Sequence, residues 1–107
     1  MKHGLLKGHL DLLLLAVLQA GPAQGYAIME ALRERSSGTF DLPEGTVYPA
    51  LHRLERLGLL QSTGTEAGGR RRRVYELSPQ GREAARAHHR EWAAFAAGVQ
   101  AVLRGTA

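Results

Sequence analysis

Apolar residues recur at helical spacing near the start of the chain. A helix over residues 5–20 would carry one broad apolar face, made of Leu6, Leu10, Leu13, Leu14 and Val17 and widened by Leu5, Leu12 and Leu15. So wide a stripe predicts a helix that is covered from more than one side.

Two more helices follow at the same period. The turn-forming stretch GPAQG, residues 21–25, precedes a second helix over residues 26–35. The segment LPEGTVYPALHRLERLGLL predicts a third helix that ends at Gly58, because a residue without a side chain suits the left-handed cap position.

The pattern then changes to short strands and back to a helix. Residues 60–65 and 72–77 surround a glycine-containing loop, which predicts a β-hairpin. Ser78 and Pro79 are typical of an N-cap and a first helical turn, so we expect a last helix that reaches about Arg104.

The third helix has two contrasting sides. At 100° per residue, its inward stripe consists of Val47, Ala50, Leu51, Leu54 and Leu57. The opposite side carries Gly45, Pro49, His52, Arg53 and Arg56, with Thr46 and Tyr48 on its flanks. A slim, donor-rich, cationic face fits the major groove of DNA. On this segment alone, an amphipathic helix with a solvated face fits equally well.

Charge adds a second feature to this picture. The 107 residues carry a formal net charge of +4, which favours polyanions or anionic membrane surfaces as partners. Four consecutive arginines, Arg70, Arg71, Arg72 and Arg73, follow two glycines in front of the second strand. An arginine run alone is more often a solvated loop, but guanidinium groups match phosphate oxygens well. Behind such a third helix, the run predicts the wing of a winged helix.

The last helix carries an apolar seam with alternating steps of four and three residues. The seam consists of Ala85, His89, Trp92, Ala96, Val99 and Leu103, and Phe95 and Val102 broaden it. An exposed seam of this kind predicts a homodimer, whose interface the first helix completes through Leu6, Leu10 and Leu13. Packing of the seam onto its own domain is the alternative.

Several other classes of protein are disfavoured. The chain has no cysteine, and the run from Leu12 to Leu18 is too short to span a bilayer, so we expect a cytoplasmic protein. His88 and His89 are adjacent and their side chains diverge, so we expect no metal site and no cofactor. The sequence shows no combination of nucleophile and base that would predict an enzyme.

Two motifs carry a family resemblance. GTVYPALHRLERLGLL (45–60) and GRRRRVYELSPQGR (69–82) resemble the signature of the PadR family of transcriptional regulators, and GYAIMEAL (25–32) is similar to its second helix. Tyr26, in this last segment, joins the predicted DNA contacts. Pro43 and Val74 depart from the family pattern, which commonly has a serine-type cap and a tyrosine at these positions.

The resemblance implies a homodimeric winged-helix protein of the short subfamily, usually a repressor that releases its operator when an effector binds. It also implies drug-like or phenolic effectors held in the dimer interface. Trp92 and Phe95 are therefore predicted to bind a planar aromatic molecule, with two facing indoles around it, although Trp92 fits equally well as a seam residue alone.

The expected fold is mainly α with a small β-hairpin. Residues 1–78 would form a winged helix-turn-helix DNA-binding domain, and residues 79–107 a dimerisation helix. The predicted function is a homodimeric repressor that binds double-stranded DNA at an inverted repeat. A winged-helix protein-interaction module is the alternative, and a peripheral membrane protein is disfavoured because the first helix lacks a cationic polar face.

Overall fold

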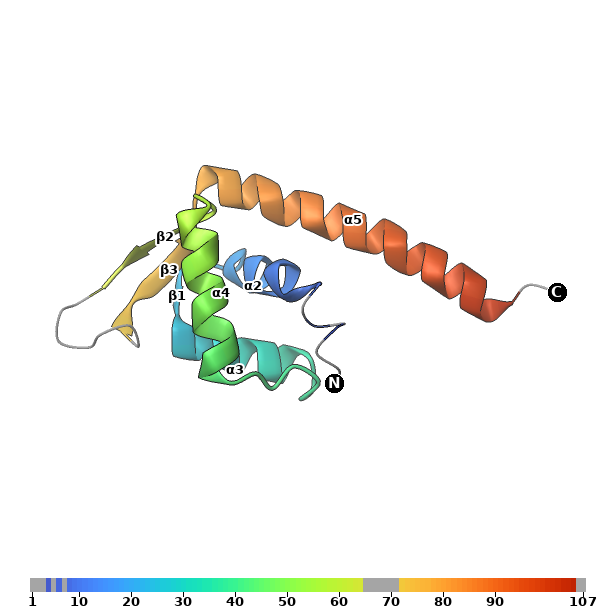
Figure 1. Ribbon diagram of the computed structural model, residues 1–107, viewed down its shortest axis with the longest axis horizontal. Coiled ribbons are helices and arrows are strands. Elements are labelled where there is room, and N and C mark those ends of the chain that lie inside the picture. The colour runs from blue at the N-terminus through green and yellow to red at the C-terminus, as the bar shows by residue number, and fades with distance from the viewer. Residues whose placement is uncertain (1–3, 5, 7, 65–71, 106–107) are drawn as a thin grey trace.

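The computed structural model describes residues 4, 6, 8–64 and 72–105 and confirms the predicted order of elements (Figure 1). Its helices are α2 (Leu10–Leu18), α3 (Gly25–Arg35), α4 (Glu44–Arg56) and α5 (Pro79–Arg104). Its strands are β1 (Ala23–Gln24), β2 (Leu60–Thr63) and β3 (Val74–Leu77).

The first helix is shorter than predicted. Gly8 and His9 form a turn in which the His9 N–H donates to the Leu6 carbonyl at 2.9 Å, and α2 begins only at Leu10. Glycine weakens a helix interior, which explains the early break. The expectation of cover from several sides is confirmed, because the adjacent Leu14 and Leu15 are both fully buried. Helices α3, α4 and α5 and strand β3 all contact α2.

The sheet contains one strand that the sequence pattern does not reveal. β3 lies in the middle, with β1 on one side and β2 on the other, and both pairings are antiparallel. Leu60 faces Leu77 and Ser62 faces Tyr75 in the predicted hairpin. β1 was predicted only as part of a turn, because two residues are too few to show alternation.

The end of α4 agrees with the sequence in one respect and differs in another. Gly58 has the predicted left-handed conformation, with φ of 82°. Leu57 was predicted to point inward, but it is 62% exposed. It is the C-cap residue just past Arg56, and on the helical wheel it lies at the edge of the apolar stripe, where the helix ends.

Ser78 joins the end of α4 to the start of α5. Its hydroxyl donates to the Gly58 carbonyl at 2.6 Å and accepts from the Gly81 N–H at 2.9 Å. Its own N–H donates to the Leu59 carbonyl at 3.0 Å. Ser78 is therefore the predicted N-cap of α5, and it also connects α5 to the end of α4 through hydrogen bonds. These bonds fix the direction in which α5 leaves the domain (Figure 1).

Gly81 permits the close contact at this junction, and its replacement tests the junction. A β-carbon on Gly81 would lie 1.9 Å from the Leu59 carbonyl oxygen, so Gly81→Ala is expected to cost about 2–3 kcal/mol of unfolding free energy. Gly45→Ala is the matched control, because its added methyl group would have no neighbour within 4 Å beyond the adjoining residues and backbone of its own helix. The free energy of unfolding, measured by chemical denaturation, should fall only in the Gly81 variant. Equal stability of both variants would contradict this packing.

Candidate nucleic-acid interface

Helix α4 buries one side and presents the other. Its apolar stripe packs into the core through Val47, Ala50, Leu51 and Leu54, as predicted. On the opposite side Gly45, Pro49, Arg53 and Arg56 are exposed, and Thr46 and His52 are half-buried. The first turns of this side consist of small residues, so a second molecule can approach the helix closely here.

Pro49 interrupts the backbone hydrogen bonds of α4 on this side. It lies in the second turn of α4, where an ordinary residue would donate its N–H to the carbonyl of Gly45. Proline has no N–H, so the Gly45 carbonyl lacks its helical donor. Both residues are exposed, so this interruption of the helical hydrogen bonds lies on the outer side of the helix.

Tyr48 was predicted among the DNA contacts, and the structure contradicts this. Its side chain is only 2% exposed. The ring covers Gly25 at the start of α3 so closely that a β-carbon on Gly25 would lie 2.5 Å from Cε1 of Tyr48. The flank of α4 that carries Tyr48 faces the protein, and Tyr48 is a core residue.

Arg53 is exposed on α4 as predicted, but a carboxylate holds it. Its Nη2 and Nη1 atoms donate to the two carboxylate oxygens of Asp11 on α2, at 2.6 and 3.0 Å. These hydrogen bonds raise the pKa of Arg53 above its ordinary value. The two residues are 42 positions apart, and no local pattern in the sequence signals their contact.

The arginine run lies only partly within the described residues. Arg70 and Arg71 lie outside them, whereas Arg72 is exposed and Arg73 is half-buried. Nη1 of Arg73 donates to Oγ of Ser62 at 3.0 Å, and that hydroxyl donates to Oε2 of Glu55 on α4 at 2.6 Å. Arg73 thus braces the base of the hairpin against the helix.

Tyr26 lies at the outer surface of α3 and is 63% exposed. Its hydroxyl donates to Glu30 at 3.0 Å, and Glu30 also pairs with Arg33. The hydrogen bond to Glu30 raises the pKa of Tyr26, and the hydrogen bond from Arg33 lowers that of Glu30. The phenol is therefore held in place on an accessible surface.

The predicted seam of α5 divides into two parts. Ala85 is buried in the core of its own chain, as is Leu10 on α2, so neither is available to a second chain. Beyond them the helix leaves the domain (Figure 1), and Trp92, Val99 and Leu103 are exposed. Of the other predicted interface residues, His89 is exposed, and Leu6, Leu13 and Ala96 are half-buried.

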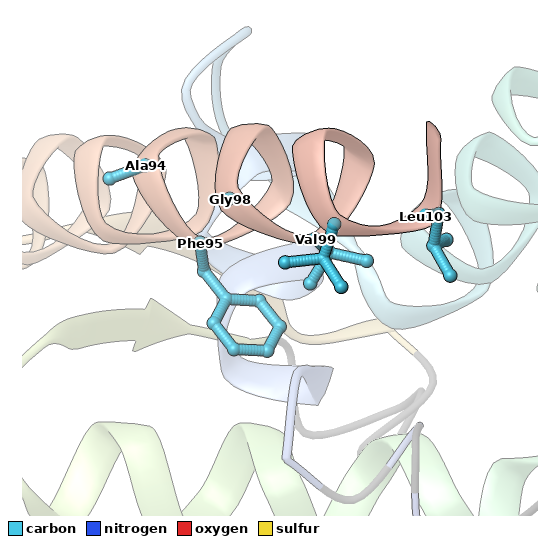
Figure 2. A pocket seen from close by; sticks show the side chains of 6 residues that line it. Ala94, Phe95, Gly98, Val99 and Leu103 are labelled. Carbon is cyan, nitrogen blue, oxygen red and sulfur yellow. The ribbon is translucent and has the colours of Figure 1, made fainter. Parts of the chain in front are cut away.

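A shallow apolar surface follows the exposed part of α5. It is formed by Ala94, Phe95, Gly98, Val99, Val102 and Leu103, five of which Figure 2 labels. A hollow of about 270 Å³ lies beside Trp92, between α5 and the start of α2. There the rings of His9 and Trp92 meet nearly edge to face, with centroids 4.9 Å apart, a contact that no pattern in the sequence signals.

Neither a metal site nor a membrane span is found in the part of the chain that the structure describes. Within it, no group of three histidine or acidic side chains is arranged to hold a metal ion. No described helix is both long enough and apolar enough to cross a membrane.

Comparison with known proteins identifies the family. A model of the transcriptional regulator PadR-like family matches residues 14–87. The chain is 48% identical over 52 residues to Transcriptional regulator Rv3488 of Mycobacterium tuberculosis (strain ATCC 25618 / H37Rv), which covers 49% of each protein. It is also 26% identical over 94 residues to an uncharacterized protein of Lysinibacillus sphaericus, over 87% of this chain and 86% of that protein.

Solved structures of transcriptional regulators share the fold. A regulator from Clostridium thermocellum has a TM-score of 0.81 at 26% identity, over 94% of this chain and 95% of that chain. A PadR family regulator from Eggerthella lenta DSM 2243 has a TM-score of 0.80 at 30% identity, over 96% and 88%. These likenesses confirm the predicted fold class, and the family consists of regulators rather than enzymes. The chain therefore belongs to the PadR-like family of transcriptional regulators.

Proposed function

We propose that the protein is a homodimeric repressor in the cytoplasm that binds duplex DNA at an inverted repeat. The observation that carries this proposal is the outer side of α4, which exposes a slim and partly cationic surface in a PadR-like chain. Thr46, Pro49 and His52 would meet base edges, and Arg56, Arg72 and Tyr26 would meet phosphates.

The second half of α5 supports the dimer. No residue from Ala93 to Leu103 is charged, and Gln100 has the only polar side chain among them. Val102 and Leu103 are nevertheless 78% and 73% exposed in the single chain. A helix that is apolar on most sides needs cover on most sides. In a two-fold dimer, the same segment of the partner and the partner's α2 would supply it.

The proposed division of the chain at residue 78 is functional rather than structural. The first two turns of α5 pack on the DNA-binding core, through the buried Gly81 and Ala85. The rest of α5 would form the dimer interface. One continuous helix would therefore connect that interface to the end of α4 through Ser78.

We propose that an effector releases this repressor from DNA, and that it binds in the hollow beside Trp92. Trp92 and Phe95 have ring centroids 6.0 Å apart, and the ring of His9 also lies against Trp92. A planar aromatic molecule would stack among such rings at the dimer interface. It would release DNA only if it bound the DNA-free arrangement of the dimer more tightly than the DNA-bound arrangement.

Selection of bound sequences from random duplex DNA tests the proposed function. Two α4 helices related by a two-fold axis should select an inverted repeat, with half-sites about 10 base pairs apart or a multiple of that distance. Retention on duplex DNA should also weaken steeply with salt. If the chain binds no duplex, the protein-interaction alternative replaces this proposal, and removing the arginines would leave that function intact.

The helix and the wing should contribute differently to binding. Thr46→Ala and His52→Ala are expected to relax discrimination among sequences, by about 1–3 kcal/mol for each side chain that meets a base edge. Arg72→Ala is expected to weaken binding to every duplex and to flatten its log–log salt dependence, by up to about 0.9 for each phosphate that the arginine meets. The proposed roles are wrong if the wing variant alters sequence preference and the helix variants do not.

A charge on the exposed face of α5 should separate the protomers. Val102→Glu would bury an unpaired carboxylate in the proposed interface, so we expect the dimer to weaken by at least about tenfold. Gln100→Glu adds the same charge at the polar position of the same segment and serves as the control. Sedimentation equilibrium measures the dimer dissociation constant of each variant. Equal association of both variants would exclude this face as the interface.

Fluorescence tests the effector site, because Trp92 is the only tryptophan. Planar aromatic compounds that relieve repression are expected to quench Trp92 emission, and operator DNA is expected to oppose that quenching. Trp92→Leu should retain the dimer and DNA binding but lose induction. A variant that is still induced, together with unperturbed emission in the parent protein, would leave Trp92 as a packing residue only.

A further inference from the structure

The ion pair between Asp11 and Arg53 is unusual among the described ion pairs. The other two, Glu30 with Arg33 and Glu83 with Arg86, join residues three positions apart within one helix. Asp11 instead reaches from α2 to the exposed side of α4 and contacts Arg53 with both of its oxygens. Bidentate pairing fixes the plane of the guanidinium as well as its position.

The place of Arg53 on α4 makes this contact relevant to DNA binding. Arg53 follows Pro49 by four residues and precedes Arg56 by three, so it lies beside both on the helix surface. An unrestrained arginine at this place has a side chain long enough to join Arg56 in contacts with phosphates. Arg53 is drawn toward α2 instead, and the carboxylate neutralises its charge.

We infer that Asp11 is a positioning residue that withholds Arg53 from the DNA backbone and so limits sequence-independent binding. A phosphate that approached the paired guanidinium would also approach the carboxylate, and two anions beside one cation repel each other. Contacts to the phosphate backbone of DNA supply essentially all of the affinity for nonspecific sequences. Each backbone contact that is withheld therefore leaves a larger share of binding to the residues that meet base edges.

The location of Asp11 supports this role. It lies in the first turn of α2, where the helix dipole stabilises a carboxylate. The core fixes that turn, because the neighbouring Leu10 and the following Leu14 and Leu15 are buried. The anion is therefore rigidly placed, while the guanidinium at the end of its long side chain adapts to it.

The experiment measures the affinity of the full chain for a duplex of mixed sequence over a range of salt concentrations. Asp11→Asn is expected to raise this affinity about tenfold at low salt and to steepen the log–log salt dependence by about 0.9 per protomer. Arg53→Gln should reverse the gain when added to Asp11→Asn, and should have a much smaller effect in the parent protein. A non-additive double-mutant cycle of this kind is a result that weakened packing alone does not produce.

Glu83→Gln is the matched control. It removes the same charge and also frees an arginine, Arg86, from an ion pair, but on α5. It should reproduce only the small effect of one additional net positive charge. Thermal unfolding of each variant shows that the compared proteins are folded.

The outcomes separate this inference from the proposed function on which it rests. If the parent protein shows no salt-dependent binding to duplex DNA, the proposed function fails. If it binds and Asp11→Asn leaves affinity and salt dependence like those of Glu83→Gln, the inference alone is overturned. It is also overturned if Asp11→Asn weakens binding while the protein remains folded, because Asp11 would then hold Arg53 in a DNA-binding position.

Discussion

The packing of one side of α4 into the core is the interaction on which the rest of the structure depends. Val47, Leu51 and Leu54 are fully buried there, so the rotation of the helix about its axis is fixed. Fixing that rotation decides which side chains face outward, and Gly45, Pro49 and Arg56 are among them. The outer side is thus a consequence of the apolar stripe, and any DNA contact that α4 makes inherits its geometry from the core.

Carboxylates decide what the arginines around this surface can do. Arg53 is held by Asp11, and Arg73 is connected through Ser62 to Glu55. Counting basic residues therefore overstates the charge that is available to a polyanion. The start of α2 also lies at a junction, because its N-cap His9 contacts Trp92 while Asp11 in its first turn contacts Arg53. The same segment therefore contacts both α5 and the outer side of α4.

Local sequence chemistry predicts much of the fold, but it does not predict contacts between distant residues. Gly58 and Ser78 were placed correctly because caps depend on the residue and its immediate neighbours. Tyr48 lies at the edge of the apolar stripe of α4, and Ala85 is the first position of the seam of α5, so only the packing of neighbouring elements decides what each side chain contacts. The pairing of Arg53 with Asp11 likewise needed the tertiary structure, because 42 residues separate the two.

Photo-crosslinking from single positions tests the central claim most directly, namely that the outer side of α4 is the surface that contacts DNA. A photoreactive residue at position 49 would stand on that side without disturbing the core, and one at position 91 would stand on α5, also exposed. With duplex DNA bound and salt kept low, the account predicts efficient crosslinks to DNA from position 49 and none from position 91. Crosslinks from position 91 without any from position 49 would contradict it.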